Sequence, residues 1–192
     1  MCDGRPIRAI QIDARTIYSA DDSVIPSFVR ALVNDLHWQT TDETIRRDLL
    51  FAVGDACDSR RLSETERLLR ARPYIRSALV VPVATGDGGV QILVLTRDEL
   101  SLEVRLRLRG GGFPVKRLVV TEDNVFGRGL HLRTFYNDFG RRPAYYADAL
   151  DPHLLGRRIE VEVMGGKSEV GPVAEETIRR AFESEFDRVA WR

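Results

Sequence analysis

Residues 102–109, LEVRLRLR, alternate strictly between apolar and charged side chains, and an extended strand separates such a sequence onto two faces. Such a strand lies half-buried in a soluble sheet, or it lies in a transmembrane barrel with lipid on one face and a wet lumen on the other. This strand alone favours neither reading. One face carries Leu102, Val104, Leu106 and Leu108, and the other carries Glu103, Arg105, Arg107 and Arg109.

Four further stretches alternate in the same way, and turns rich in Gly or containing Asp and Pro separate them. The last stretch places Ile159, Val161 and Val163 opposite Arg158, Glu160 and Glu162. Several consecutive strands with charge on one face favour the barrel. Four aromatic residues lie near strand ends, and they fit either an interfacial aromatic girdle or an ordinary core: Tyr136, Phe139, Tyr145 and Tyr146. The stretches are residues 113–121, 129–139, 142–150 and 157–166.

The region before residue 98 shows mixed periodicity. Residues 7–12 predict a strand with Ile7, Ala9 and Gln11 on one face. Residues 14–40 fit two alternatives, a short helix at 27–36 or a strand followed by a loop. Two later runs, 76–84 and 89–97, predict a β-hairpin, because the glycines at 86, 88 and 89 supply the positive φ of its turn.

Two helices are predicted between these strands. Thr40 and Glu43 suggest a capping box for the first helix, and Gly54 follows its end. Residues 61–72 predict the second helix, which Pro73 ends. The order strand, two helices, strand, strand is an α+β unit with helices on one sheet. The apolar faces are Ile45, Leu49 and Leu50 in the first helix and Leu62, Thr65, Leu68 and Leu69 in the second, and the expected core residues are Ile45, Leu49, Leu69, Leu79 and Ile92.

Composition excludes several classes of protein. Lys+Arg and Asp+Glu are both 29, so no overall field favours nucleic acid. No apolar run reaches the roughly 18 residues of a transmembrane helix, so any spanning must use strands. The N-terminus lacks the apolar core of a signal peptide, which is expected upstream. Cys2 and Cys57 match no metal or redox spacing and suggest no disulfide framework.

No catalytic motif is present, and we expect no enzyme activity, no metal and no cofactor. The three histidines, at 37, 131 and 153, are far apart in sequence. Glycine runs at 110–112 and 127–129 do not lead into a helix as a phosphate loop does. The carboxylate pairs at 175–176 and 183–185 carry no glycosidase pattern.

The order of short motifs is nevertheless specific. NDLHWQT, IRRDLLFAVGD, SETERLLRARPYIRSA, VQILVLTRDELSL, EDNVFGRGLHLRTFYND and YYADALDPHLLGRRIEVEV follow one another from about residue 30. In this combination the chain resembles the BamA/TamA-type outer-membrane protein assembly family, including its surface-antigen-like and two-partner-secretion relatives. The resemblance implies a POTRA-like periplasmic domain at residues 1–98 with the order β-α-α-β-β. It implies that residues 99–192 are the first antiparallel strands of an outer-membrane β-barrel.

The resemblance also implies a function and a location. Such proteins fold or export other β-proteins without a cofactor or catalytic residues, and the partners are unfolded outer-membrane or secreted β-proteins and outer-membrane lipid. Client strands would add to a sheet edge of the POTRA-like domain by main-chain hydrogen bonds. That edge would be Arg76, Ser77, Ala78, Leu79, Val80 and Val81, and the barrel-start motif would be Asn124, Phe126, Gly127 and Gly129, followed at the next turn by Asp151, Pro152 and Gly156.

The sequence departs from the family in two ways. About 95 residues after Asp98 supply roughly five or six strands, too few to close the family's barrel, which suggests a truncated barrel. Residues 174–192 look more helical than a barrel strand. Two alternatives stay open: a soluble α+β protein-interaction adaptor, and the accessory barrel region of a patatin-like lipase, whose G-x-S-x-G segment would lie upstream.

Overall fold

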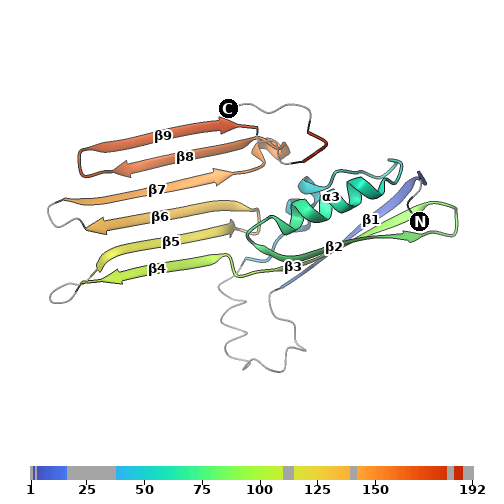
Figure 1. The fold of residues 1–192 in the computed structure, drawn as a ribbon, viewed down its shortest axis with the longest axis horizontal. Helices are drawn as coiled ribbons and strands as arrows, with labels where there is room; N and C mark the ends of the chain where they lie inside the picture. The colour runs from blue at the N-terminus through green and yellow to red at the C-terminus, as the bar shows by residue number, and fades with distance from the viewer. Residues whose placement is uncertain are drawn as a thin grey trace, which may run out of the picture. The chain divides into compact units, whose positions relative to one another are not determined.

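The computed structural model describes residues 2, 4–16, 38–109, 115–138, 142–180 and 184–187. These residues form two compact units, the first made by residues up to Leu100 together with 184–187, and the second made by Ser101 onward (Figure 1). The helix considered at 27–36 and the aromatic Phe139 lie outside the described residues.

The first unit contains a three-stranded sheet with β3 in its centre. The strands are β1 (Ile7–Arg15), β2 (Ile75–Ala84) and β3 (Val90–Asp98), in the order β1-β3-β2. β3 pairs in parallel with β1 and antiparallel with β2, so the predicted hairpin is confirmed. Its turn uses Gly88 at φ 82°, a conformation that glycine adopts without steric cost.

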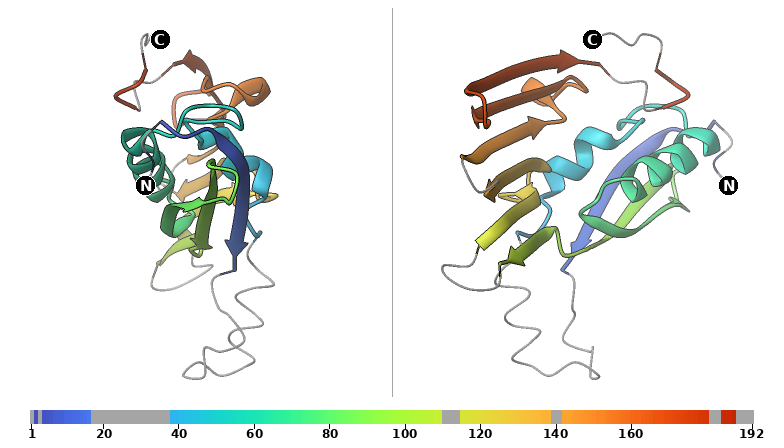
Figure 2. Two further views of the ribbon diagram at one scale, coloured as in Figure 1. Left: turned by 90° about the vertical axis from the view of Figure 1, so that its right-hand side faces the viewer. Right: turned by 60° about the vertical axis from the view of Figure 1, so that its left-hand side comes forward.

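Among the described residues, two helices lie between β1 and β2 in the chain (Figure 2). Helix α2 (Asp42–Asp48) is capped by Thr41, whose hydroxyl accepts from the Thr44 N–H, so the predicted Thr40–Glu43 capping box is wrong. Thr40 N–H instead donates to the Asp98 carboxylate at 2.7 Å, which fixes Thr40 in the segment before the helix. The helix ends at Asp48, well before Gly54.

The second helix, α3 (Ser59–Arg70), covers one face of the sheet and contacts β2 most extensively. Asp58 caps it by accepting from the Arg60 N–H at 2.9 Å. The apolar face that the sequence predicted is buried in full. Its members are Leu62, Thr65, Leu68 and Leu69.

The core of this unit confirms most of the expected residues. Ile45, Leu69 and Ile92 are buried and Leu49 is partly buried, but Leu79 is 50% exposed. A register shift in β2 between Ile75 and Ser77 causes this error, because one extra residue moves every later side chain to the opposite face. The buried members of β2 are therefore Ala78 and Val80.

A similar shift in β1 reverses the predicted inner face of that strand. The register changes between Ile7 and Ala9, so Ile10, Ile12 and Ala14 pack against the core with Ile7. Ala9 and Gln11, which were expected beside Ile7, are exposed.

A disulfide joins Cys2 to Cys57, and the expectation of no disulfide framework is wrong. The segment before β1 runs beside the loop before α3. There Cys57 N–H donates to the Arg5 carbonyl at 2.8 Å, and Ile7 N–H donates to the Asp55 carbonyl at 2.9 Å. These backbone contacts bring the two cysteines together although 55 positions separate them in sequence, which spacing alone could not indicate.

The second unit is a six-stranded antiparallel meander in the order β4-β5-β6-β7-β8-β9. A short 3₁₀ turn at Leu154–Gly156 precedes β8. Over residues 174–179 the expected helical segment is wrong, because these residues belong to β9, whose β-branched side chains suit the free edge that β8 offers. The strands are β4 (Leu102–Leu108), β5 (Val115–Val125), β6 (Leu130–Asp138), β7 (Pro143–Asp151), β8 (Glu160–Lys167) and β9 (Pro172–Arg179).

Candidate functional site

The predicted client-binding strand, Arg76–Val81, lies in β2 at an edge of the three-stranded sheet. Val80 N–H donates to a carboxylate oxygen of Glu66 on α3 at 3.1 Å, so this N–H points away from β3. Alternation in an antiparallel ladder turns the N–H of Ala78 to the same side. Pro82 has no N–H and ends the series of donors.

The side chains of this strand divide between the core and the solvent. Ala78 and Val80 are buried, Val81 is half-buried, and Arg76, Ser77 and Leu79 are exposed. An added strand would therefore meet backbone groups at the edge and one exposed apolar side chain, Leu79. Main-chain pairing of this kind tolerates many client sequences.

Glu66 is a feature of this edge that the sequence did not indicate. Its carboxylate accepts from Val80 N–H and also pairs with Arg70 one helical turn later, at 2.7 Å. An incoming carbonyl must replace Glu66 at Val80. Only the packing of α3 on β2 reveals this contact, because Glu66 by itself reads as an ordinary helix surface residue.

One face of the six-stranded sheet is mostly apolar, although the register also places Lys167 and Glu176 on it. The register places Val104 opposite Val120, Leu106 opposite Leu118, and Val120 in turn opposite Thr134. Val104, Leu106 and Leu108 are each more than half exposed. Tyr136 and Tyr145 face each other on this side near one end of the sheet, whereas Tyr146 lies on the other face. The other exposed apolar side chains of this face are Leu132, Val163 and Ile178.

The opposite face is charged and internally paired. Arg133 donates to Asp148 at 2.8 Å, Arg105 to Glu103 at 2.5 Å, and Arg179 to Glu160 across β8 and β9. The prediction that Arg105, Arg107 and Glu160 share the face opposite the leucines is confirmed by the register. Stacked rings of Phe135 and Tyr146, with centroids 4.6 Å apart, lie among these charges.

The predicted barrel-start residues form the turn between β5 and β6. Asn124 is fully buried, and its side-chain oxygen accepts from Gly129 N–H at 2.9 Å. Phe126, Gly127 and Gly129 have positive φ, which explains the two glycines. This is the second hairpin of the meander, because β4 and β5 form the first.

The second group of predicted residues forms the connection from β7 to β8. Asp151 accepts from His153 N–H at 2.8 Å, Pro152 and His153 are buried, and Gly156 has φ 73°. In a meander both of these turns lie at the same end of the sheet. The two turns expose apolar side chains there, because Phe126 is 66% and Leu155 is 91% exposed.

A histidine lies between two carboxylates on the charged face of the second unit. His131 Nδ1 lies 2.5 Å from Asp123, and its Nε2 lies 3.4 Å from Asp148. No group of three or more His, Cys, Asp or Glu side chains among the described positions could hold a metal ion. No described helix is long and apolar enough to cross a membrane.

Comparison with known proteins gives a result for structure alone. No family model and no curated protein matches the sequence. The fold is similar to BamA from Haemophilus ducreyi lacking POTRA domains 1–3, with TM-score 0.59 and 13% identity over 91% of this chain and 31% of that one. It is also similar to CdiB from Acinetobacter baumannii, with TM-score 0.50 and 11% identity over 94% of this chain and 34% of that one.

These matches define the fold. The six-stranded sheet is of the kind that forms the barrels of BamA-type proteins, and the chain spans about a third of the length of the two structures. At 11–13% identity the likeness assigns no activity, substrate or partner.

Proposed function

We propose that this chain is part of an outer-membrane protein assembly or translocation factor. The observation that carries the proposal is the six-stranded sheet with an exposed apolar face and an ion-paired charged face. A water-soluble sheet covers its apolar face, whereas a barrel strand presents that face to lipid. A soluble adaptor would have to cover the apolar side chains of β4 with other parts of the protein. Among the described residues these side chains are exposed, which disfavours that alternative.

The first unit is, in this proposal, a POTRA-like domain that receives client strands. Its element order among the described residues, β1-α2-α3-β2-β3, and its edge strand β2 support the assignment. An unfolded β-protein would add a strand beside Arg76–Val81 and form hydrogen bonds at Ala78 and Val80. The clients are unfolded outer-membrane or secreted β-proteins.

The disulfide supports a periplasmic position for this unit. Structural disulfides form and persist in oxidising compartments such as the bacterial periplasm and are rare in the cytosol. The charged sheet face then lines an aqueous interior, while the apolar face lies in the outer membrane. This support is independent of the likeness to BamA and CdiB.

Vesicle flotation of the full chain tests the membrane assignment. The chain should float with phosphatidylcholine vesicles, and a variant with Val104→Asn, Leu106→Asn and Leu108→Asn should float at least about tenfold less, because each change places an amide on the lipid face. Glu103→Gln with Arg105→Gln alters the other face of the same strand and should float normally. Equal flotation of the two variants would contradict the assignment.

Amide exchange tests the client edge. A peptide copied from a barrel strand should protect the amides of Ala78 and Val80 in the full chain. Glu66→Gln should strengthen binding, because a neutral amide competes less well for Val80 N–H than a carboxylate does. Glu43→Gln, which removes an exposed carboxylate from α2, should leave binding unchanged. Protection confined to other residues would show that clients do not bind at this edge.

A further inference from the structure

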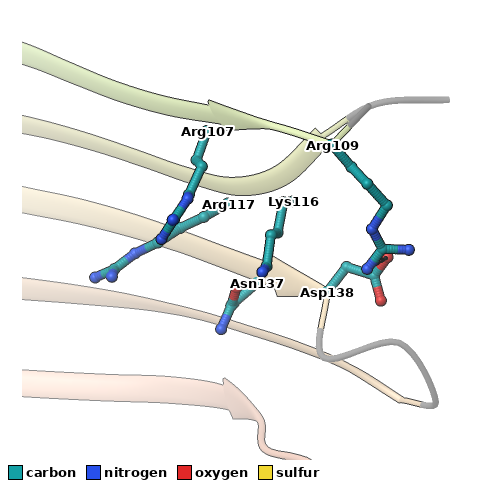
Figure 3. A pocket seen from close by; sticks show the side chains of 6 residues that line it. All are labelled: Arg107, Arg109, Lys116, Arg117, Asn137 and Asp138. Carbon is teal, nitrogen blue, oxygen red and sulfur yellow. Dashed lines mark ion pairs between the residues drawn. The ribbon is translucent and has the colours of Figure 1, made fainter. Parts of the chain in front are cut away.

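A cationic hollow lies on the charged face of the second unit, where β4 and β6 end and β5 begins (Figure 3). It has a volume of about 330 Å³. Four cationic side chains and one carboxylate give its lining a net charge of +3. The lining residues are Arg107, Arg109, Lys116, Arg117, Asn137 and Asp138.

Two of these cations are forced together by strand pairing. Arg107 and Arg117 lie directly opposite each other across β4 and β5, an arrangement of like charges that destabilises a sheet. Figure 3 shows the two side chains extending side by side over the same face. Arg117 also lies over the ring of Phe135, with its guanidinium carbon 5.2 Å from the ring centroid.

A register shift between Arg107 and Leu108 adds a third cation. The shift makes Lys116 the extra residue of β5, and its side chain lies beside that of Asn137 in the hollow (Figure 3). Three cations therefore lie around the same space. Lys116 and Arg117 are adjacent in sequence, so strand alternation alone predicts that their side chains lie on opposite faces of the sheet.

The carboxylate of the lining does not neutralise these three cations. Asp138 pairs with Arg109, at 3.3 Å. Elsewhere on this face Arg105 pairs with Glu103, and Arg133 pairs with Asp148. The hollow thus differs from its surroundings in having more positive than negative charge among the described residues.

We propose that this hollow binds a phosphate group, carried by a lipid headgroup or by a small soluble phosphate compound. A phosphate placed between Arg107 and Arg117 would accept forked hydrogen bonds from both guanidinium groups and relieve their repulsion. Lys116 adds a third charge, and the Asn137 amide supplies a neutral donor. The site rests on the charged face itself and stands whether or not the first unit binds client strands.

Two titrations of the full chain in zwitterionic detergent test the site and distinguish the two sources. The first uses inorganic pyrophosphate, and the second uses mixed micelles of that detergent with phosphatidic acid. Saturable binding of pyrophosphate points to a soluble phosphate compound. Saturable binding of phosphatidic acid alone points to a headgroup.

In whichever titration shows binding, Arg107→Gln with Arg117→Gln should weaken it at least about tenfold. Arg128→Gln with Arg157→Gln removes two exposed arginines from the turns at the opposite end of the sheet, and should change binding less than about twofold. Far-ultraviolet circular dichroism checks that both variants keep the sheet. The site is refuted by equal losses in the two double variants, or by no saturable binding of either ligand.

Discussion

Arg72 holds the buried carboxylate of Asp48 through two hydrogen bonds, of 2.9 Å from its Nε and 2.6 Å from its Nη2. The side chain of Asp48 is 1% exposed, and that of Arg72 is 14% exposed. Arg72→Met would leave a buried carboxylate without its cation and should lower the free energy of unfolding by about 3–5 kcal/mol. Denaturant unfolding followed by circular dichroism measures this.

The exposed pair of Arg47 and Glu43 provides the control. Their atoms lie 3.4 Å apart in the same helix, and Glu43 is 68% exposed. Arg47→Met should change stability by less than about 1 kcal/mol. Similar losses in the two variants would mean that Asp48 is solvated in solution.

The disulfide should stabilise the first unit substantially. Cross-linking positions 55 residues apart restricts the unfolded chain, and the loop-entropy relation gives about 4 kcal/mol. Cys2→Ser with Cys57→Ser should show a loss of this order in denaturant unfolding. A reducing agent should destabilise the natural chain equally and leave the variant unaffected. Two free thiols in unreduced, unfolded protein would show that the bond does not form.

Acid should destabilise the first unit through Glu64. Hydrogen bonds from Arg67, at 2.8 Å to each carboxylate oxygen, lower the pKa of Glu64 from 4.5 to about 2. A folded-state pKa below the unfolded value means that this stabilisation is complete above pH 4.5 and is lost as the pH falls toward 2. Glu64→Gln should therefore flatten the dependence of stability on pH in this window, measured by urea unfolding at a series of pH values.

Arg67→Gln serves as the matched change, because it removes the donor and leaves the carboxylate. It should raise the pKa of Glu64 toward its ordinary value and flatten the same part of the pH profile. An unchanged profile in both variants would assign the acid sensitivity to other groups.

Gly166 should be the glycine of β8 that cannot be replaced. It pairs with Tyr146, and an added Cβ would collide with the Tyr145 carbonyl oxygen and lie 2.5 Å from the Tyr146 Cα. Gly166→Ala should cost about 1–3 kcal/mol by forcing β7 and β8 apart. Gly165→Ala, where nothing lies within 4 Å of the new Cβ, should be neutral or mildly stabilising. Thermal unfolding of the two variants distinguishes them, and equal midpoints would contradict the predicted collision.

The sequence predicted the elements whose pattern is regular. The apolar face of α3, the β2–β3 hairpin and the faces of β4 all follow from local periodicity, because side chains repeat at fixed intervals along a helix or strand. Leu79 and Ala9 were assigned to the wrong face because a single extra residue reverses a strand, and no local signal marks where that residue falls.

Features that depend on distant contacts could not be read from the sequence. The Cys2–Cys57 bond needs the backbone pairing of the N-terminal segment, and Glu66 reaches Val80 only after α3 packs on β2. The prediction of a helix is wrong over residues 174–179 for the same reason, since the partner strand β8 determines the conformation of β9. Local propensity is a weak predictor where a neighbouring strand supplies the hydrogen bonds.

The parallel pairing of β1 imposes an order on folding. β2 and β3 are joined by a short turn, so they can pair locally. Among the described residues, the only strand partner of β1 lies about 80 positions further along the chain. Loop closure over that distance is slow compared with hairpin formation. β1 is synthesised before β2 and β3 and is therefore the last of the three to join the sheet. Until Val90–Asp98 has formed, β1 stays available to any chaperone, or to another exposed strand edge.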